Sequence, residues 1–275
     1  MRMSGVVDDV RRLGRFDHVC WAFDDADTFR AQAVTFLAQG LADGQRVWFV
    51  GDPDPRVVDA LPAASEGAFE VVTTSSTYSS GVEVDADSQV RTYARSTEQA
   101  LADGFTGLRV ATDATPLVRT RGQLEAFTRY EHQVDRYMAG SPFSAMCGYD
   151  RGVLGGDAVA ELACMHPNAN DDATPFRLHA ATLPGCAAAI GGELDILTED
   201  LLVKALRRAD LRPDPQGELV LDATALTFLD HNRLLQLVGH AEGLGARLVL
   251  RTDQPIPRRL VQLMDLPAVR IEAAR

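Results

Sequence analysis

The amino-acid sequence predicts an α/β protein of two domains, in which the larger, first domain contains a mostly parallel sheet. Short apolar runs alternate with long amphipathic segments between residues 19 and 164. Such alternation is typical of parallel strands joined by crossover helices. A polar, turn-rich stretch at 168–174 interrupts this pattern, and a shorter alternation follows it. With 275 residues, of which 46% are hydrophobic, the chain is long enough for two cores.

The first domain is expected to contain five strands that alternate with helices. The strands are predicted at 19–23, 46–50, 69–72, 108–111 and 143–147. The helices are predicted at 26–42, 55–61, 85–101, 123–138 and 155–164. The helices 26–42 and 85–101 are both closely followed by Asp-Gly, which favours a helix end because glycine readily adopts a left-handed conformation. Connections between the parallel strands should be right-handed.

The second domain is expected to be a smaller α/β unit. Its strands are predicted at 218–222 and 245–250, and its helices at 199–209, 234–246 and 257–266. These patterns place the first domain at 14–170, a linker at 171–183 and the second domain at 184–275.

Charge and composition exclude several classes of protein. The net charge is −12, and most of the acidic excess precedes Pro184, so the first domain should repel the phosphates of DNA. No apolar run approaches the roughly 20 residues that span a bilayer, and the N-terminus has no apolar core typical of a secretion signal. We therefore expect a cytoplasmic protein without direct DNA or membrane binding. The four cysteines form no CxxC motif and should be reduced thiols.

Several short motifs, in order, resemble one family of sensory domains. They are His18 in the first strand, FLAQGLADGQRVWFV at 36–50, GLRVATD at 107–113, YEHQVDRYM at 130–138, CGYD at 147–150 and HP at 166–167. Together they resemble the MEDS sensory domain over about residues 15–168. The resemblance implies a RecA-like fold and the sensing of a small molecule. Ala114-Thr115-Pro116 stands where that family often has Met and an aromatic residue.

The motifs of common enzymes are missing from this sequence. A RecA-like ATPase needs the phosphate-binding loop GxxxxGK[ST], which does not occur here. The nucleophile motif Gly-x-Ser-x-Gly is also missing. We therefore predict a protein that is not an enzyme, with no catalytic residue and no resident cofactor, although an unidentified small molecule could bind. An enzyme built on the first domain, dependent on Asp113 or Glu131, remains an alternative.

The candidate ligand residues of the first domain come from the motifs and from the carboxyl edge of the sheet, where open α/β sheets bind ligands. They are His18, Arg109, Asp113, Glu131, Cys147, Tyr149, Asp150 and His166. The expected ligand is a modest, partly apolar molecule near Asp113 and Tyr149, with one polar or anionic group facing Arg109.

Structural roles for the same residues stay open. The aspartates could cap the helices that follow the strands, and Arg109 could form a buried ion pair with Glu131. His18 and His166 could be buried, hydrogen-bonded residues. Histidine and cysteine are also metal ligands, so a metal or redox site that includes Cys20 and Cys164 is an alternative; their spacing is not diagnostic, and we predict no metal site.

The segment GELVLDATALTFLDHN, at 217–232, resembles the STAS domain of anti-sigma factor antagonists. In that family a Ser that follows the Asp is phosphorylated by a partner kinase. Here Asp230 is kept, while His231, Asn232 and Arg233 occupy the following positions. The resemblance implies a partner-binding surface at Asp230–Arg233 for an anti-sigma factor or another ATPase of the Ser/Thr kinase type. The missing hydroxyl implies that the phosphorylation switch is lost.

These observations predict a regulatory protein in which a sensory domain gates protein binding by a STAS domain. Gating requires that a ligand bind one arrangement of the domains better than another. A scaffold or adaptor that responds to no ligand is the main alternative.

Overall fold

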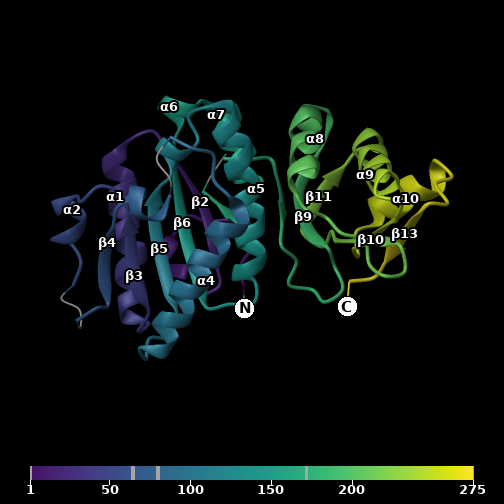
Figure 1. Cartoon of the computed structure of the whole chain (residues 1–275). Coiled ribbons are helices and arrows are strands. Elements are labelled where there is room, and N and C mark those ends of the chain that lie inside the picture. Colours follow the sequence, from purple (N-terminus) through teal and green to yellow (C-terminus); the bar gives the residue numbers. More distant parts are fainter. Residues whose placement is uncertain (1, 63–65, 79–80, 171–172, 275) are drawn as a thin grey trace. The chain divides into compact units, whose positions relative to one another are not determined.

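A seven-stranded sheet, in which every strand runs parallel to its neighbours, organises the first part of the chain (Figure 1). The computed structural model describes residues 2–62, 66–78, 81–170 and 173–274, which form the units Met1–Ala173 and Thr174–Arg275. In spatial order, the strands of the first unit are β1 (Gly5–Val6), β7 (Asn168–Ala169), β2 (His18–Phe23), β6 (Phe143–Asp150), β5 (Leu108–Asp113), β3 (Arg46–Val50) and β4 (Phe69–Val72).

Helices cover both faces of this sheet. The helices of the unit are η1 (Val10–Arg12), α1 (Ala26–Ala42), α2 (Pro55–Val58), α3 (Thr74–Thr77), α4 (Ala86–Ala102), η2 (Thr115–Leu117), α5 (Arg121–Met138), α6 (Arg151–Leu154) and α7 (Gly156–Ala163). Helix α1 packs on one face, which we call the α1 face, and α4, α5 and α7 pack on the other, the α5 face.

Strand alternation assigns each residue of β2 to one of these faces. Val19 and Trp21 belong to the core under α1, whereas Cys20 belongs to the core under α5. Gly148 on β6 allows α1 to approach closely, because a Cβ atom there would lie 2.3 Å from the ring of Phe29.

The ends of the helices follow from local sequence. Asp25 caps α1 by accepting a hydrogen bond from the backbone N–H of Thr28 at 3.0 Å. Thr120 and Gln123 form a capping box at the start of α5. Gly155 has φ = 80°, and it separates α7, which the sequence predicts at 155–164, from the short helix α6, which the sequence did not predict. The sequence also predicts a polar loop at 73–80 after β4; its described residues contain the short helix α3, and residues 79–80 lie outside the described residues.

The second unit has a smaller, mixed sheet. Its elements are β8 (Phe176–His179), β9 (Ala188–Leu194), η3 (Ile196–Thr198), α8 (Glu199–Arg208), β10 (Glu218–Asp222), β11 (Leu226–Leu229), α9 (His231–Gly243), β12 (Arg247–Arg251), α10 (Pro255–Leu263) and β13 (Val269–Glu272). The strand order is β11-β9-β10-β12-β13, all parallel, and β8 pairs with β9 in the antiparallel sense. Strand β8 lies within the segment expected to be a linker.

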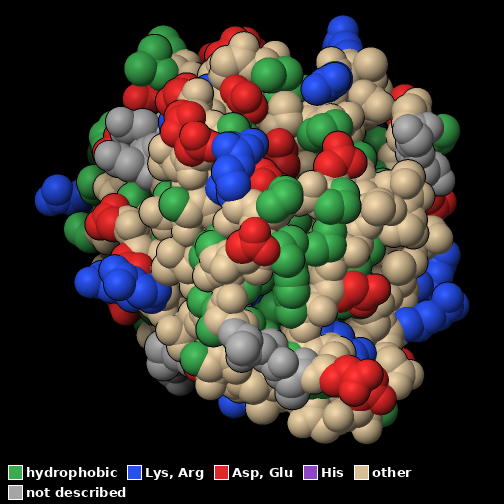
Figure 2. Space-filling view, turned by 90° about the vertical axis from the view of Figure 1, so that its left-hand side faces the viewer, with side chains coloured by type: hydrophobic (Ala, Val, Ile, Leu, Met, Phe, Trp, Pro, Cys, Tyr) green, Lys and Arg blue, Asp and Glu red, His purple; other side chains and the backbone are tan. Residues whose placement is uncertain are grey.

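The predicted fold class is confirmed: the protein is α/β, with a parallel sheet followed by a smaller second sheet. In the described part of the chain, none of the helices combines the length and apolar character needed to cross a membrane. Figure 2 shows the side of the first unit where β4 forms the edge, and acidic and basic side chains are interspersed there around a hydrophobic strip.

Candidate functional site

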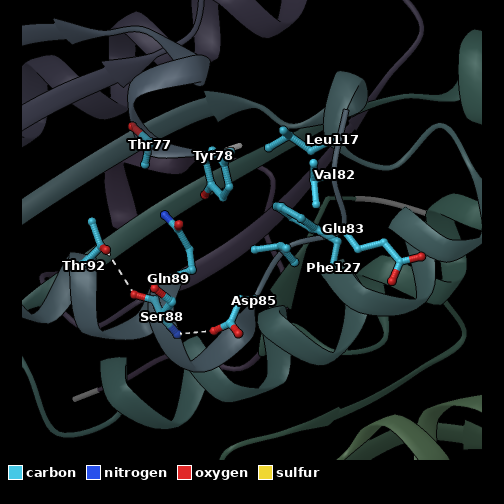
Figure 3. A pocket seen from close by; sticks show the side chains of 11 residues that line it. Thr77, Tyr78, Val82, Glu83, Asp85, Ser88, Gln89, Thr92, Leu117 and Phe127 are labelled. Atoms are coloured by element: carbon cyan, nitrogen blue, oxygen red, sulfur yellow. Dashed lines mark hydrogen bonds between the residues drawn. The ribbon is translucent and has the colours of Figure 1, made fainter. Parts of the chain in front are cut away.

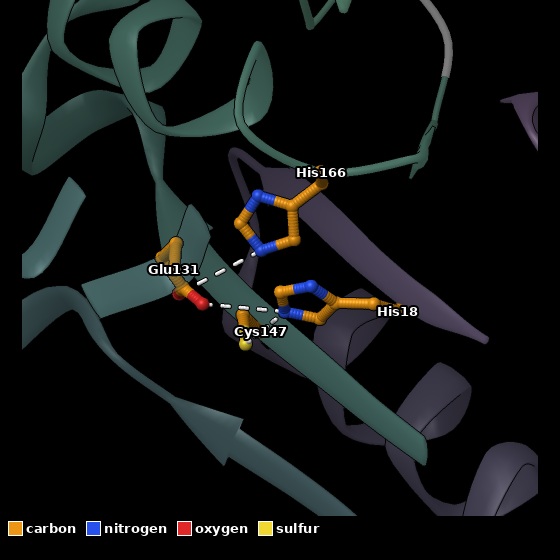
Figure 4. Close-up of side chains that lie close together, drawn as sticks. All are labelled: His18, Glu131, Cys147 and His166. Atoms are coloured by element: carbon orange, nitrogen blue, oxygen red, sulfur yellow. Dashed lines mark hydrogen bonds and ion pairs between the residues drawn. The ribbon is translucent and has the colours of Figure 1, made fainter. Parts of the chain in front are cut away.

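Four side chains of chemically reactive types meet beneath α5, in the interior of the first unit (Figure 4). They are His18 on β2, Glu131 on α5, Cys147 on β6 and His166 after α7, and we call them the buried cluster. His18 Nε2 lies 3.2 Å from Glu131 Oε2 and 3.6 Å from Cys147 Sγ. His166 Nε2 lies 3.6 Å from Glu131 Oε1. The sequence nominated all four residues, and the fold brings them together.

Neighbouring groups orient the side chains of the cluster. His18 Nδ1 lies 3.1 Å from Asp135 Oδ1, and the guanidinium of Arg2 also donates to this carboxylate. His166 Nδ1 lies 2.9 Å from the carbonyl oxygen of Leu162. A carboxylate and a carbonyl are acceptors, so each ring carries its hydrogen on Nδ1 and turns the lone pair of Nε2 toward Glu131.

Burial favours the uncharged form of every member of the cluster. It lowers the pKa of His166 to about 3, with the neighbouring His18 adding to the effect, and it lowers the pKa of His18 well below its ordinary value. It raises the pKa of Glu131, and it raises the pKa of the Cys147 thiol well above its usual range.

Tyr149 completes this site from within the core. Its hydroxyl donates to Glu131 Oε1, and its side chain is fully buried. Burial raises the pKa of this phenol well above its usual range. Tyr149 therefore belongs to the cluster and not to an open ligand crevice, where the sequence places it.

Arg109 lies apart from the cluster, on the α1 face. Its Nε donates to Gln45 Oε1 at 2.8 Å, and its two terminal nitrogens donate to the carbonyl oxygens of Phe36 and Leu13 at 3.2 and 3.1 Å. The ion pair with Glu131 that the sequence suggested is therefore not formed. An arginine held within the core also cannot serve as the counter-charge of a ligand at the carboxyl edge, which corrects that expectation.

The aspartates at the carboxyl edge have local roles. Asp150 caps α6 by accepting from the N–H groups of Gly152 and Val153 at 2.8 and 3.2 Å. Asp113 Oδ1 accepts from the N–H of Thr115 at 3.0 Å. Asp113 also lines an open crevice of about 460 Å³ on the α1 side of this edge. Capping is thus the role that the structure shows for Asp150.

A more enclosed cavity of about 270 Å³ lies at the same edge, between α4 and α5 (Figure 3). Its lining combines the rings of Tyr78 and Phe127 with the carboxylates of Glu83 and Asp85. The Nε2 atom of Gln89 in this lining is buried, and it interacts with the Tyr93 side chain without forming a well-aligned hydrogen bond to any described residue. The sequence did not identify this cavity, because its wall comes from loops and helices without a recognisable motif.

In the second unit, the four residues from Asp230 to Arg233 form the start of α9 and not a free turn. Asp230 caps the helix by accepting from the N–H of Arg233 at 2.7 Å. The guanidinium of Arg233 is buried, and it donates to Asp195 O at 3.1 Å and to Glu199 Oε2 at 3.0 Å. His231 and Asn232 are exposed. Of these four residues, Asp230 is half-buried and Arg233 is buried, so His231 and Asn232 expose the most side-chain surface.

Sequence reasoning missed Asp135, which holds His18 in its orientation. The signal was available, because Glu131 and Asp135 are four residues apart in the predicted helix and therefore share one face. Two carboxylates on the buried face of a helix require partners.

Comparison with known families identifies one match. The family model MEDS, described as the methanogen/methylotroph, DcmR sensory domain, matches residues 17–167. No curated protein matches the chain. The match covers the parallel sheet from β2 to the residue before β7, and it includes all four residues of the buried cluster.

Proposed function

The chain belongs to the MEDS family of sensory domains, and we propose that it is a regulatory protein in which this domain senses a small molecule and controls protein binding by the second unit. The observation that carries the proposal is the family match over residues 17–167, which indicates a sensing and regulatory role. In this proposal the protein acts in the cytoplasm, by binding other molecules and not by catalysing a reaction.

The cavity between α4 and α5 is the proposed sensory pocket. Enclosed, partly apolar cavities with a few polar groups are the usual binding sites of small molecules. Gln89 offers a buried N–H donor whose approach to Tyr93 does not make a well-formed hydrogen bond, and Tyr78 and Phe127 offer aromatic surface. Glu83 and Asp85 would repel an anion. The proposed ligand is therefore small, uncharged and partly apolar, with a hydrogen-bond acceptor that faces Gln89.

Ligand binding can be tested through the donor on Gln89. Candidate ligands are first identified by native mass spectrometry of the purified protein and by thermal shift, since a ligand raises the melting temperature by mass action. Gln89→Leu should weaken binding roughly 5-fold, the effect of losing one hydrogen bond of about 1 kcal/mol. The matched control is Gln99→Leu, which changes an exposed glutamine on the same helix. Equal affinities of the two variants would place the ligand elsewhere.

The second unit is proposed to be a STAS-type binding module. Its support is the segment 217–232 and the position of Asp230 as the cap of α9, with His231 and Asn232 exposed beside it. Large apolar side chains are exposed nearby: Ile196 and Leu197 in η3 are 71% and 88% accessible. Exposed apolar groups next to polar ones are typical of protein-binding surfaces. The proposed partner is an anti-sigma factor or a related ATPase of the Ser/Thr kinase type.

This partner surface can be tested with one added negative charge. His231→Glu resembles phosphorylation and should leave the fold intact while it weakens binding to the anti-sigma factor. Gln254→Glu is the matched control, because it adds the same charge at the start of α10. The binding assay uses a panel of purified kinase-type anti-sigma factors, and phosphate is mapped by mass spectrometry. Stoichiometric phosphorylation of Thr224 or Thr227 would show that the switch has moved and is not lost.

A further inference from the structure

We propose that His18, Glu131, Cys147 and His166 form a binding site for a single divalent transition-metal ion of the Zn²⁺ type. Each residue offers one ligand atom: the Nε2 of each imidazole, a carboxylate oxygen and the thiolate sulfur. These are the atoms that bind zinc in proteins. The site does not depend on the small-molecule ligand or on the protein partner proposed above.

The distances within the cluster suit a tetrahedral site. Metal–ligand bonds of about 2.0–2.3 Å place tetrahedral ligand atoms roughly 3.3–3.8 Å from one another. In the cluster, three separations are 3.2, 3.6 and 3.6 Å, and all four ligand atoms lie within 4.8 Å of one another. Small side-chain movements would therefore place all four atoms around one ion.

The hydrogen bonds around the cluster are those that metal-binding histidines need. Such histidines donate their other ring N–H to a carboxylate or carbonyl, which fixes the tautomer and the ring orientation. His18 does so through Asp135, and His166 does so through the carbonyl oxygen of Leu162. Tyr149 also orients the carboxylate of Glu131, because its hydroxyl donates a hydrogen bond to Oε1. Three of the four ligands are thus already oriented.

The excess of hydrogen-bond acceptors in the cluster also favours binding of a cation. Both Nε2 atoms carry lone pairs, and so does every oxygen of Glu131 that is not protonated. His166 Nε2 is buried and has no hydrogen-bond partner among the described residues, although it points at Glu131 (Figure 4). An unsatisfied buried acceptor costs about 1–3 kcal/mol. A metal ion would satisfy this atom and the lone pairs around it together.

The charges balance when the metal binds. A divalent ion with one thiolate, one carboxylate and two neutral imidazoles has no net charge, and the two protons of Cys147 and Glu131 leave to solvent. Asp135 is neutralised separately by Arg2. A neutral assembly is what a fully buried site can hold at low cost. The soft sulfur and the imidazoles favour Zn²⁺ over Mg²⁺ or Ca²⁺, which prefer oxygen ligands.

A site with four protein ligands has no open position for a substrate, so the ion would stabilise the domain and not catalyse a reaction. His166 immediately follows the turn at the end of α7, and it links that helix to β2, β6 and α5. Metal binding would therefore fasten together segments that are distant in sequence. Because the cluster is buried, the ion would enter during folding or through local opening.

The experiment uses the whole chain, refolded from urea with Co²⁺ and then freed of excess metal by gel filtration. A single Co²⁺ should remain on each chain, with the visible absorption of a tetrahedral ion and a thiolate-to-cobalt charge-transfer band. Cys147→Ser should remove the charge-transfer band, and His166→Gln should lower the affinity at least tenfold. Cys186→Ser and His240→Gln, a thiol and an imidazole of the second unit, are the matched controls.

X-ray absorption of the unmodified protein refolded with Zn²⁺ covers the case in which a variant fails to fold. It should show one sulfur and three nitrogen or oxygen ligands. Failure of the refolded chain to retain Co²⁺ would overturn the proposal. So would a charge-transfer band that persists in Cys147→Ser, or a zinc shell without sulfur.

Discussion

The two faces of the seven-stranded sheet bury polar side chains in opposite ways. On the α1 face, each nitrogen of Arg109 donates to an acceptor of the protein, and its guanidinium lies over the ring of Phe36. On the α5 face, His18, Glu131 and His166 direct lone pairs at one another, and one of these atoms has no hydrogen-bond partner among the described residues.

The difference distinguishes a side chain that supports the fold from a group of side chains arranged to bind. The bonds of Arg109 join α1, β5 and the residue that follows η1, and a carbonyl that loses such a donor stays buried without a partner. The cluster, by contrast, joins its elements through contacts that a proton or a metal ion must mediate. Substitutions should therefore affect stability strongly on the α1 face and weakly in the cluster.

The largest expected effect is that of Arg109→Met. The change leaves Gln45 and two backbone carbonyls without their donor, and it should lower the free energy of unfolding of the first unit by roughly 3–5 kcal/mol. Both tryptophans, Trp21 and Trp48, lie in this unit, so urea unfolding followed by their fluorescence reports on it. Arg129→Met, in an exposed ion pair on α5, should cost less than about 0.5 kcal/mol. Similar losses in both variants would contradict the structural role of Arg109.

A smaller effect is expected from Gly40→Ala on α1. The added Cβ would lie 2.7 Å from Arg109 Cδ and 2.8 Å from Val47 Cγ1, and neither atom can move freely. Overpacking costs about 1–3 kcal/mol, which exceeds the roughly 0.5–1 kcal/mol that alanine gains over glycine in a helix. Gly239→Ala on α9 meets no atom within 4 Å and should stabilise its unit. Thermal unfolding measures the stability of both variants. If Gly40→Ala stabilised the protein, Arg109 would have to be loosely packed.

Much of the fold of the first unit could be predicted, because its strands and helices bury regular apolar patterns. Predicted and observed bounds coincide for Ala26–Ala42, Arg46–Val50 and Phe69–Val72. The two-residue strands β1 and β7 were missed, since so short a segment carries no periodicity. Strand β8 was missed because its residues looked like part of a polar connection.

The candidate site was harder to predict than the fold. The family resemblance nominated His18, Glu131, Cys147 and His166, but it nominated Arg109 equally. To separate Arg109 from the cluster, one must know which face of the sheet each strand residue points to. Strand alternation shows which residues share a face, but not which helices cover that face. Whether the sensory domain gates the second unit, and whether Asp230 and His231 contact a partner, stay predictions, since both concern binding and not the isolated fold.

The smallest effect on stability is expected from Glu131→Gln. This variant is also the sharpest test of the contrast between the two faces of the sheet. The glutamine keeps the shape of the side chain, its oxygen can accept from Tyr149, and its NH₂ group can donate to His18 Nε2. The free energy of unfolding of the metal-free protein should therefore change by less than about 1 kcal/mol. The anionic ligand is lost, so retention of Co²⁺ after refolding should fall by more than about tenfold.

Two measurements on Glu131→Gln separate the possible states of the cluster. Burial raises the pKa of Glu131 in the folded protein. The metal-free wild type therefore loses stability as the pH rises above the pKa that Glu131 has in the unfolded chain. Glutamine has no such cost, so urea titrations should show the variant gaining stability relative to the metal-free wild type as the pH rises above the ordinary pKa of glutamate. A loss of roughly 3–5 kcal/mol would instead show an ionised Glu131 paired with a protonated histidine. The cluster would then support the fold as Arg109 does, and the contrast between the two faces would disappear.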